Sequence, residues 1–462
     1  MSDTVNMHVI RGNVVTPVGV LYGGHLQVVG EVIHRVCASD VPVPTADDVR
    51  QAFPDARNVS ISVMDAPFVV PGFVDIHNHG AGGSDEVCDH WLHPEFSQRY
   101  FARCGTLSTL ASVIFSQSRA DVVARVIASI ETRVGKYFDD CCVIEGIHAE
   151  GPVINDRGGL PPGNTNPSLD EFKALCATMP SMKIMTISPT LEAVSGYKRL
   201  QHLVDLGVRP SLGHDRECTE QAILGALLVT KSADAEVAKQ KNDKGGKRTV
   251  DAVAAVPADA KMHSTHIFNV MSFHHRSPSL INFLLCKKFP GGTKYRGAVP
   301  PTVEIIADLI HVHPVVIQSV LSARDPSDVA IISDCISTYE PGKRLKYNGR
   351  TIAVKAEGGC YLCDQHGSPT KTLAGSTVTL ADQFFALITH FGLDVATACL
   401  LLATTPAKIA KIGDRVGSLE GGKKANVLLI NGEMNTIIRR MIYGHWINGE
   451  PYRMLKPSIS HL

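Results

Sequence analysis

The sequence predicts an α/β fold, a (β/α)8 barrel of the TIM type joined to a small β-sandwich domain built from both chain ends. Three observations lead to this fold class. The 462 residues exceed what one hydrophobic core usually supports. Apolar runs rich in Val and Ile alternate with segments of helical length, which is typical of βαβ units around a parallel sheet. Polar residues end these runs, where a parallel barrel gathers its functional groups.

Both ends of the chain have a sequence pattern that is typical of short strands. Runs that favour β-structure, such as Val14–Thr16 and Val59–Val63, occupy the first part, and Gly, Pro and Asp punctuate them. Runs that favour strands occur again from about Gly413, for example in Ala425–Ile430. We therefore expect residues 1–68 and 412–462 to form the small domain and residues 69–411 to form the barrel.

The barrel strands are predicted from apolar runs in the middle of the chain. Helices are expected between them, among them Ala120–Arg133 and Leu169–Ala177. The charged stretch Lys231–Thr249 is expected to be an exposed excursion, with its basic residues on a solvated face rather than in a binding patch. The predicted strands are Val69–His77, Cys142–Glu150, Ile184–Ser188, Pro210–His214, His263–Phe268, Val303–His311 and Val329–Asp334.

The amino-acid composition limits the kinds of binding partner that we expect. Lys and Arg total 45, as do Asp and Glu, so bulk charge gives no reason to expect nucleic acid or an acidic membrane as partner. No apolar stretch approaches the roughly 18 residues of a membrane span, and no secretory signal begins the chain. Most of the 12 cysteines are therefore expected to be reduced and buried. Cys360-x-x-Cys363 is interpreted as structural rather than as a redox or zinc motif.

The last three residues, Ser460, His461 and Leu462, are similar to the Ser-Lys-Leu peroxisomal address. This pattern favours import into a peroxisome-like organelle such as a glycosome. A tripeptide also matches by chance fairly often, so a cytoplasmic location stays open as the alternative.

The 20 histidines raise the expectation of a metal site, because several stand in short clusters. His77 and His79 are two residues apart, so on a strand both side chains face the same side and both can bind one ion. Gly80, Gly82 and Gly83 follow them and allow a close approach of the backbone to a ligand. Two ordinary polar residues at a strand end are the alternative interpretation of the pair.

Other candidate ligands end other apolar runs. Glu150 needs a cation or hydrogen bonds if it is buried there, and a metal or a salt bridge would satisfy it. His148 shares the face of Glu150 and is interpreted as a supporting residue. His214 and His266 each end a short run, whereas His263 would face the other side of its strand. Two to four histidines and one carboxylate form a site suited to Zn²⁺ or Fe²⁺.

Asp334 ends the last apolar run and is predicted to be a general base. A bound metal lowers the pKa of water towards about 7. A nearby carboxylate can take the proton and later hand it to a leaving amine. Arg276 and His311 are the candidates for binding a small anion, because the planar guanidinium of Arg can bind phosphate through two hydrogen bonds at once. A surface salt bridge would explain Arg276 as well.

Taken in order, these segments resemble the amidohydrolase superfamily, and specifically the N-acetylglucosamine-6-phosphate deacetylase family. The resemblance covers nearly the whole chain. A His-x-His pair would indicate only the superfamily. The Thr-His-x-Phe-Asn run with a following Arg, and Leu-Ala-Gly-Ser-Thr after the last-strand Asp, indicate the sugar-phosphate deacetylases. The matching runs are PGFVDIHNHGAGG, HAEGP, SLGH, STHIFNVM followed by HHR, IIADLIHVHP, ISDC, LAGST and TPAKIA.

The resemblance implies metal-dependent hydrolysis of the N-acetyl group of N-acetylglucosamine 6-phosphate to glucosamine 6-phosphate and acetate, in amino-sugar catabolism. It implies one or two divalent ions per subunit, Zn or Fe, with Glu150 bridging where there are two, and Asp334 as the catalytic acid/base. It also implies a homodimer in which the counterpart of Arg276 reaches towards the neighbouring subunit's site. The implied metal ligands are His77, His79, Glu150, His214 and His266, and the implied substrate contacts are Asn269, Val270, Arg276, His311, Leu373, Ala374 and Gly375.

Two departures from the family pattern concern the substrate pocket. The family's Gly-x-His-Asn-Pro becomes Gly163–Pro167, with Thr165 where His is expected, so Asn164 is taken as the replacement contact. The family's Ala-Asp-Gly-x-His becomes Ala307–His311, with Leu309 in the place of Gly. The rival interpretations are an amidohydrolase for a different amide and an inactive scaffold on the same fold. A scaffold predicts lost ligands, whereas all five candidates are present here.

Overall fold

The computed structural model describes residues 4–229 and 261–454. The predicted excursion at Lys231–Thr249 and the C-terminal tripeptide Ser460–Leu462 lie outside the described residues. No helix within the described ranges is long and apolar enough to cross a membrane. All 12 cysteines are unpaired, Cys360 and Cys363 included, as expected for thiols that have no disulfide role.

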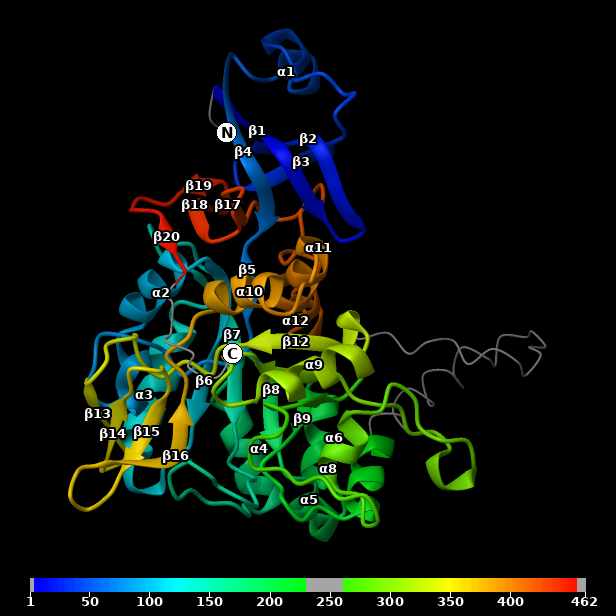
Figure 1. Ribbon diagram of the computed structural model, residues 1–462, viewed down its shortest axis with the longest axis vertical. Coiled ribbons are helices and arrows are strands. Elements are labelled where there is room, and N and C mark those ends of the chain that lie inside the picture. The colour runs from blue at the N-terminus through cyan, green and yellow to red at the C-terminus, as the bar shows by residue number, and fades with distance from the viewer. Residues whose placement is uncertain (1–3, 230–260, 455–462) are drawn as a thin grey trace.

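Within the described part of the chain, eight parallel strands surround the core of the larger part of the molecule (Figure 1). The first six pair in chain order and the last two pair with each other. Backbone hydrogen bonds join these two groups, from Ile267 N to Glu304 O at 2.8 Å and from Asp334 N to His77 O at 2.9 Å. The predicted (β/α)8 order is therefore confirmed. The strands are β5 (Phe73–Asp75), β6 (Thr106–Ile114), β7 (Val143–Glu150), β8 (Met182–Ile187), β9 (Arg209–Leu212), β10 (His263–Ser264), β11 (Val303–Ile306) and β12 (Val329–Ile332).

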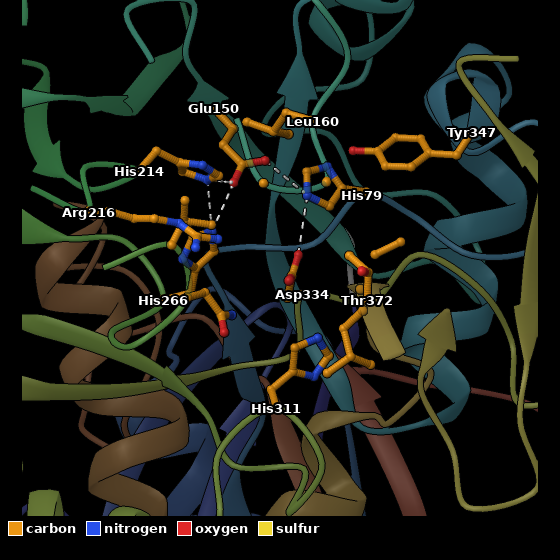
Figure 2. Close-up of a pocket in the computed structure, with 17 residues that line it drawn as sticks. His79, Glu150, Leu160, His214, Arg216, His266, His311, Asp334, Tyr347 and Thr372 are labelled. Carbon is orange, nitrogen blue, oxygen red and sulfur yellow. Dashed lines mark hydrogen bonds and ion pairs between the residues drawn. The ribbon is translucent and has the colours of Figure 1, made fainter. Parts of the chain in front are cut away.

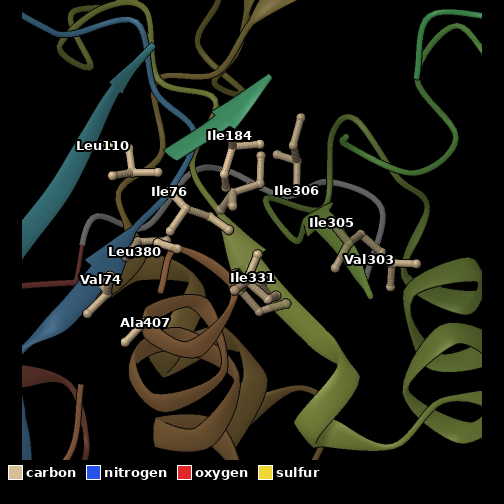
Figure 3. Packing of buried hydrophobic residues seen from close by; sticks show 14 of the residues in the cluster. Val74, Ile76, Leu110, Ile184, Val303, Ile305, Ile306, Ile331, Leu380 and Ala407 are labelled. Carbon is tan, nitrogen blue, oxygen red and sulfur yellow. The ribbon is translucent and has the colours of Figure 1, made fainter. Parts of the chain in front are cut away.

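The barrel strands are buried because both of their faces are covered. Every residue of β6, β7, β9, β11 and β12 is buried, as expected for a parallel sheet enclosed by helices. Figure 3 shows Ile76, Ile184 and Ile331 packing together in this core. Several strand predictions were too long. β10 stops at Ser264 and β11 at Ile306, and β9 and β12 each stop two residues before the predicted end. The predicted strand Val69–His77 is divided, because its first three residues belong to β4 (Asn58–Pro71) and only Phe73–Asp75 form β5. Strand β6 was not predicted.

Helices follow the barrel strands, and local signals begin several of them. Ser168 caps α4 together with Glu171, and Thr379 caps α10 together with Asp382. The prediction of α4 is confirmed, and α3 ends two residues before the predicted Arg133. The helices are η1 (Val87–Leu92), α2 (Pro94–Arg103), η2 (Gln117–Arg119), α3 (Ala120–Glu131), α4 (Leu169–Ala177), α5 (Pro189–Ser195), α6 (Lys198–Asp205), α8 (Leu280–Leu284), η3 (Thr293–Tyr295), α9 (Pro314–Ala323), η4 (Pro326–Asp328), α10 (Leu380–Thr389), α11 (Val395–Cys399), η5 (Leu400–Thr404) and α12 (Thr405–Ile409).

Strands from both ends of the chain form a second sheet, blue and red in Figure 1. Strand β17 runs antiparallel to β4, with Val427 opposite Pro71, so the predicted pairing of the two ends is confirmed. The bounds of the small domain stay a prediction. Its one helix within the described residues before the barrel is α1 (Ala46–Ala52). The strands are β1 (Thr4–Thr16), β2 (Gly19–Val29), β3 (Val32–Cys37), β4 (Asn58–Pro71), β17 (Val427–Ile430), β18 (Thr436–Ile442), β19 (His445–Trp446) and β20 (Tyr452–Arg453).

A four-stranded antiparallel sheet, which was not predicted, is inserted after β12. Its strands are β13 (Arg344–Tyr347), β14 (Arg350–Val354), β15 (Cys360–Cys363) and β16 (Pro369–Gly375). Buried residues of this sheet pack against Val87, Ile114 and Ile336 beside the barrel mouth. The sheet therefore forms one wall at the carboxyl end of the barrel.

Candidate active site and metal centre

The predicted ligands meet at the carboxyl end of the barrel (Figure 2). His77 and His79 follow β5, and Glu150 is the last residue of β7. His214 and His266 follow β9 and β10, and the predicted general base follows β12 at position 334. All of these side chains are buried, although they are polar. All of them except His77 border a cavity of about 200 Å³, and His77 Nε2 lies 3.7 Å from Glu150 Oε1. The strand-end pattern read from the sequence therefore corresponds to one place in the molecule.

Three donor atoms form a tight triangle in this cavity. Glu150 Oε1 lies 2.9 Å from His214 Nε2 and 3.0 Å from His266 Nε2, and the two nitrogens are 3.1 Å apart. A tetrahedral Zn²⁺ site with bonds of about 2.0–2.1 Å has ligand atoms about 3.3 Å apart. The triangle therefore has nearly the dimensions of a metal coordination face.

Two further imidazoles, His77 and His79, lie between Glu150 and Asp334. His79 Nε2 lies 3.3 Å from Glu150 Oε2 and 3.3 Å from Asp334 Oδ1. His77 Nε2 lies 3.7 Å from Glu150 Oε1 and 3.9 Å from Asp334 Oδ1. His77 Nε2 and Glu150 Oε2 are buried and have no hydrogen-bond partner among the described residues. Buried polar atoms without partners are costly, and a divalent ion would satisfy both.

Hydrogen bonds behind the site fix which nitrogen faces the cavity. His214 donates from Nδ1 to the carbonyl of Asp156 at 2.9 Å, and His77 donates from Nδ1 to Glu304 Oε1 at 2.6 Å. In each ring Nε2 is therefore the nitrogen that points to the site and is available to a metal, as metal-binding imidazoles require. The donor set and its orientation fit a divalent metal.

The two remaining histidines of the predicted region support these ligands. His148 lies beneath His77, with ring centroids 4.4 Å apart, and both of its nitrogens are engaged by Ile76 O and Thr186 Oγ1. Burial and the neighbouring charge of His77 lower the pKa of His148 to about 3, so it is neutral. His263 contacts Glu304 Oε2 at 3.1 Å. Their geometry is that of supporting residues.

Electrostatics keeps both carboxylates of the site ionised. Burial alone would raise the pKa of Glu150, but hydrogen bonds from the surrounding imidazoles outweigh it and hold that pKa well below its usual range. Burial acts on Asp334 in the same way, and its contact with His79 together with the charge of nearby histidines lowers its pKa. A carboxylate that stays ionised at neutral pH can accept a proton.

The backbone is strained where it presents these groups. His214, His266 and Asp334 adopt positive φ values of 54°, 22° and 46°. Val270, which is β-branched, has φ 55°, a value that such residues rarely adopt. Strain of this kind is found mainly where the surrounding structure forces a functional geometry, and here it accompanies the residues around the cavity.

Most of the predicted substrate contacts line the same cavity, namely Asn269, Val270, His311, Leu373, Ala374 and Gly375. His311 lies on the loop after β11 rather than on a strand, and its Nδ1 is 2.7 Å from Asp308 Oδ2. Burial opposes the charged imidazole, but Asp308 outweighs it and raises the pKa of His311. Leu309, in the place of the family glycine, adopts φ 65° while its side chain packs in the core.

Two predicted contacts do not line this cavity. Arg276 is exposed, and its Nε donates to His275 Nε2 at 2.9 Å. Asn164 borders a separate cavity between α3 and α4, next to Phe115 and Gly163. From the loop after β7, Gly158 and its two following neighbours line the first cavity instead.

Sequence reasoning missed several residues of the site. Arg216 lines the cavity two positions after His214, a spacing that could have indicated it. Glu304 is a carboxylate within an apolar run, the same signal that indicated Glu150. Tyr347 and Thr372 come from the four-stranded sheet, whose position no local signal in the sequence reveals.

Curated proteins of similar sequence are sugar-phosphate deacetylases. N-acetylglucosamine-6-phosphate deacetylase of Bacillus subtilis (strain 168) is 25% identical over 388 residues, which cover 80% of this chain and 82% of that protein. The enzyme of the same name from Danio rerio is 24% identical over 405 residues, or 82% and 84%. N-acetylgalactosamine-6-phosphate deacetylase of Escherichia coli O157:H7 is 23% identical over 407 residues, or 85% and 89%. No family model matches the chain.

Solved structures of enzymes with this name superpose on nearly the whole chain. N-acetyl-D-glucosamine-6-phosphate deacetylase of Mycobacterium smegmatis superposes with a TM-score of 0.71 at 20% identity, covering 96% of this chain and 100% of that one. The enzyme of Pasteurella multocida gives 0.68 at 20% identity with the same coverage. The chain is thus a homologue of the N-acetylglucosamine-6-phosphate deacetylases and has the amidohydrolase fold.

Proposed function

We propose that this protein hydrolyses the acetamide of N-acetylglucosamine 6-phosphate and releases glucosamine 6-phosphate and acetate. One observation carries the proposal: the side chains of His77, His79, Glu150, His214 and His266 converge beside an ionised Asp334. All of these side chains except His77 border one cavity. An inactive scaffold would have no reason to keep such a set of buried, partly unsatisfied donors.

The proposed metal ligands form two groups that share the carboxylate of Glu150. Glu150, His214 and His266 would hold one divalent ion, and His77 and His79 would hold a second with Glu150 between them. When bound, a metal of this kind polarises the amide carbonyl and lowers the pKa of water towards about 7. The nitrogen and oxygen donors suit Zn²⁺ or Fe²⁺. Metal analysis of the purified protein tests both the identity and the number.

Asp334 would carry the proton in both halves of the reaction. Its carboxylate takes a proton from the attacking water as the new C–O bond forms. The C–N bond then breaks, and Asp334 gives that proton to the leaving amine nitrogen. The lowered pKa of Asp334 keeps it ready as a base at neutral pH. His79, 3.3 Å from Asp334 Oδ1, holds the carboxylate towards the ligands.

The rest of the cavity would bind the sugar and its phosphate. Asn269 and His311 offer polar groups, and the raised pKa of His311 favours an imidazolium facing an anion. The segment Leu373–Gly375 would contact the sugar through its backbone. The name of the E. coli relative supports a second substrate, N-acetylgalactosamine 6-phosphate, which differs at one hydroxyl. Comparing kcat/KM for the two sugars decides between them.

The test is acetate release by the metal-loaded protein. We expect turnover of N-acetylglucosamine 6-phosphate and a loss of at least about 1000-fold in kcat for Asp334→Asn. The variant should bind metal as the wild type does, since it keeps every proposed ligand. A metal-loaded wild-type protein that releases no acetate from either sugar phosphate would overturn the proposal.

We also propose a homodimer, because Arg276 is exposed and does not line the cavity of its own chain. A basic residue that reaches a neighbouring subunit would have this placement. Sedimentation velocity measures the assembly directly, and a monomer at micromolar concentration would contradict it. Import into a peroxisome-like organelle stays a prediction from the sequence.

A further inference from the structure

The cavity contains one side chain with a permanent positive charge, Arg216, among the described residues that line it. The lining also holds two carboxyl groups, Glu150 and Asp334, beside the proposed metal ligands, and the imidazole of His311, whose Nδ1 is engaged by Asp308 at 2.7 Å. The negative charges of the two carboxylates repel the phosphate of an entering sugar. A bound metal offsets those charges at the ligands only, so the phosphate needs a cation of its own elsewhere in the cavity.

The backbone of Arg216 is held on both sides. Its N–H donates to Asp156 Oδ2 at 2.7 Å, and its carbonyl accepts from Ser279 Oγ at 3.1 Å. The residue before it, Asp215, is buried and accepts from Thr190 N at 2.7 Å. Asp156 also accepts, through its carbonyl, from His214 Nδ1. Arg216 and the ligand His214 are therefore tied to one rigid turn.

The guanidinium of Arg216, in contrast, is unengaged. Within residues 4–229 and 261–454 it forms no ion pair and no hydrogen bond, although other arginines near barrel strands, such as Arg199 and Arg209, are fully used. Figure 2 shows it beside His214 and His266 at the edge of the pocket. A fixed backbone with a free guanidinium is an arrangement suited to binding a planar or tetrahedral anion in two-point contact.

We propose that Arg216 binds the substrate phosphate from within the same chain and determines the preference for phosphorylated over unphosphorylated amino sugars. The inference rests on the proposed deacetylase function. It assigns a phosphate contact to a residue that sequence reasoning did not indicate and that lines the cavity of its own chain, which Arg276 does not.

The experiment compares Arg216→Gln, Arg216→Lys and a control, Arg125→Gln. Arg125 is an exposed arginine of α3, paired with Asp121, and it lies away from the cavity. For N-acetylglucosamine 6-phosphate, Arg216→Gln should lower kcat/KM about 10- to 100-fold through KM, with kcat changed less than about twofold. For N-acetylglucosamine both constants should be unchanged. Arg216→Lys should restore part of the loss, and Arg125→Gln should match the wild type.

A binding measurement separates this inference from the proposed function. Calorimetry with inorganic phosphate on the metal-loaded proteins should show weaker binding to Arg216→Gln, while phosphate bound to the metal would be equal in all variants. If no sugar is hydrolysed but phosphate binding still depends on Arg216, the proposed function fails and the anion site stands. Equal phosphate binding by Arg216→Gln and the wild type, or equal losses of kcat/KM for both sugars, would overturn the inference.

Discussion

A single buried carboxylate, Glu304, organises three parts of the site. Its Oε1 accepts from His77 Nδ1 at 2.6 Å and from the backbone N–H of His266 at 3.0 Å, and its Oε2 contacts His263 at 3.1 Å. Its side chain and those of His77 and His263 are fully buried. The residue thus orients one proposed ligand through its ring and another through its backbone.

Glu304→Gln should weaken metal binding about 10- to 100-fold, because an amide cannot accept from all three donors and leaves His77 free to rotate. Competition with a chelator measures the affinity without reference to turnover. Glu145→Gln is the matched control, since Glu145 is also a buried glutamate of the barrel but contacts Ser108, Arg415 and Tyr443 instead. Equal metal affinities for the two variants would contradict the role of Glu304.

Asp75 is expected to make stability depend on pH. Burial raises its pKa from 3.8 to about 7, although hydrogen bonds from Ser333 and the N–H of His77 oppose the shift. The folded state therefore holds a proton that the unfolded state releases. This contribution is complete below pH 3.8 and is lost as pH rises to about 7.

Asp75→Asn removes this titration and keeps the shape of the side chain. Between pH 5 and 7, the free energy of unfolding of the wild type should fall relative to the variant by about 1.4 kcal/mol per pH unit. Above about pH 8 the difference should be constant. Urea unfolding of both metal-free proteins at several pH values measures it. Parallel curves across this range would show that Asp75 is ionised in the folded protein.

At the scale of elements, β16 forms one side of the cavity only because it lies close to the loop after β12. Ser376 N donates to Asp334 O at 2.9 Å, and Ile336 N donates to Ser376 O at 3.0 Å. Gly375 has φ 152°, and a Cβ there would lie 2.7 Å from Ile336 Cγ2. The glycine therefore allows the segment that carries Leu373 and Ala374 to approach the ligands.

Gly375→Ala should push β16 away from Ile336 and raise KM for the sugar phosphate several-fold, with a small change in kcat. Gly367→Ala is the control. It also has a positive φ, 82°, but lies in the turn between β15 and β16, and the nearest contact of its added Cβ is Arg344 Nη1 at 3.6 Å. The control should lose stability by about 1 kcal/mol without a change in KM. A KM shift of equal size in both variants would contradict the argument.

At the scale of the whole molecule, the proposed ligands come from strands distributed around the barrel, at the ends of β5, β7, β9 and β10. A metal bound there connects elements that are distant in the sequence. Its removal leaves Glu150 buried among imidazoles without a cation to satisfy it.

Chelation should therefore lower Tm by on the order of 5 °C, because a ligand that binds only the folded state stabilises it by mass action. Calorimetric scans with and without added Zn²⁺ or Fe²⁺ measure the shift. In Glu150→Gln, which loses the carboxylate shared by both groups of ligands, the added metal should no longer change Tm. An unchanged Tm of the wild type on chelation would contradict a metal that bridges the barrel.

The sequence by itself determined the barrel and its chemistry, because both depend on local patterns. Apolar runs must be buried on two faces, and polar residues at their ends can only collect at one rim of the barrel. That logic predicted His77, His79, Glu150, His214, His266 and Asp334 together.

Only the tertiary structure decided the walls of the pocket. Tyr347 and Thr372 reach the cavity through a sheet inserted after β12, and Arg216 through a turn anchored by Asp156 and Ser279. Arg276, which matched a family position, and Asn164, which was taken as a replacement for the missing family His, lie outside it. Loops pack according to contacts with distant segments, and those contacts leave no periodic signal in the chain. Strand-end chemistry is therefore readable from the residues alone, whereas the identity of the substrate-binding side chains depends on how the loops fold over it.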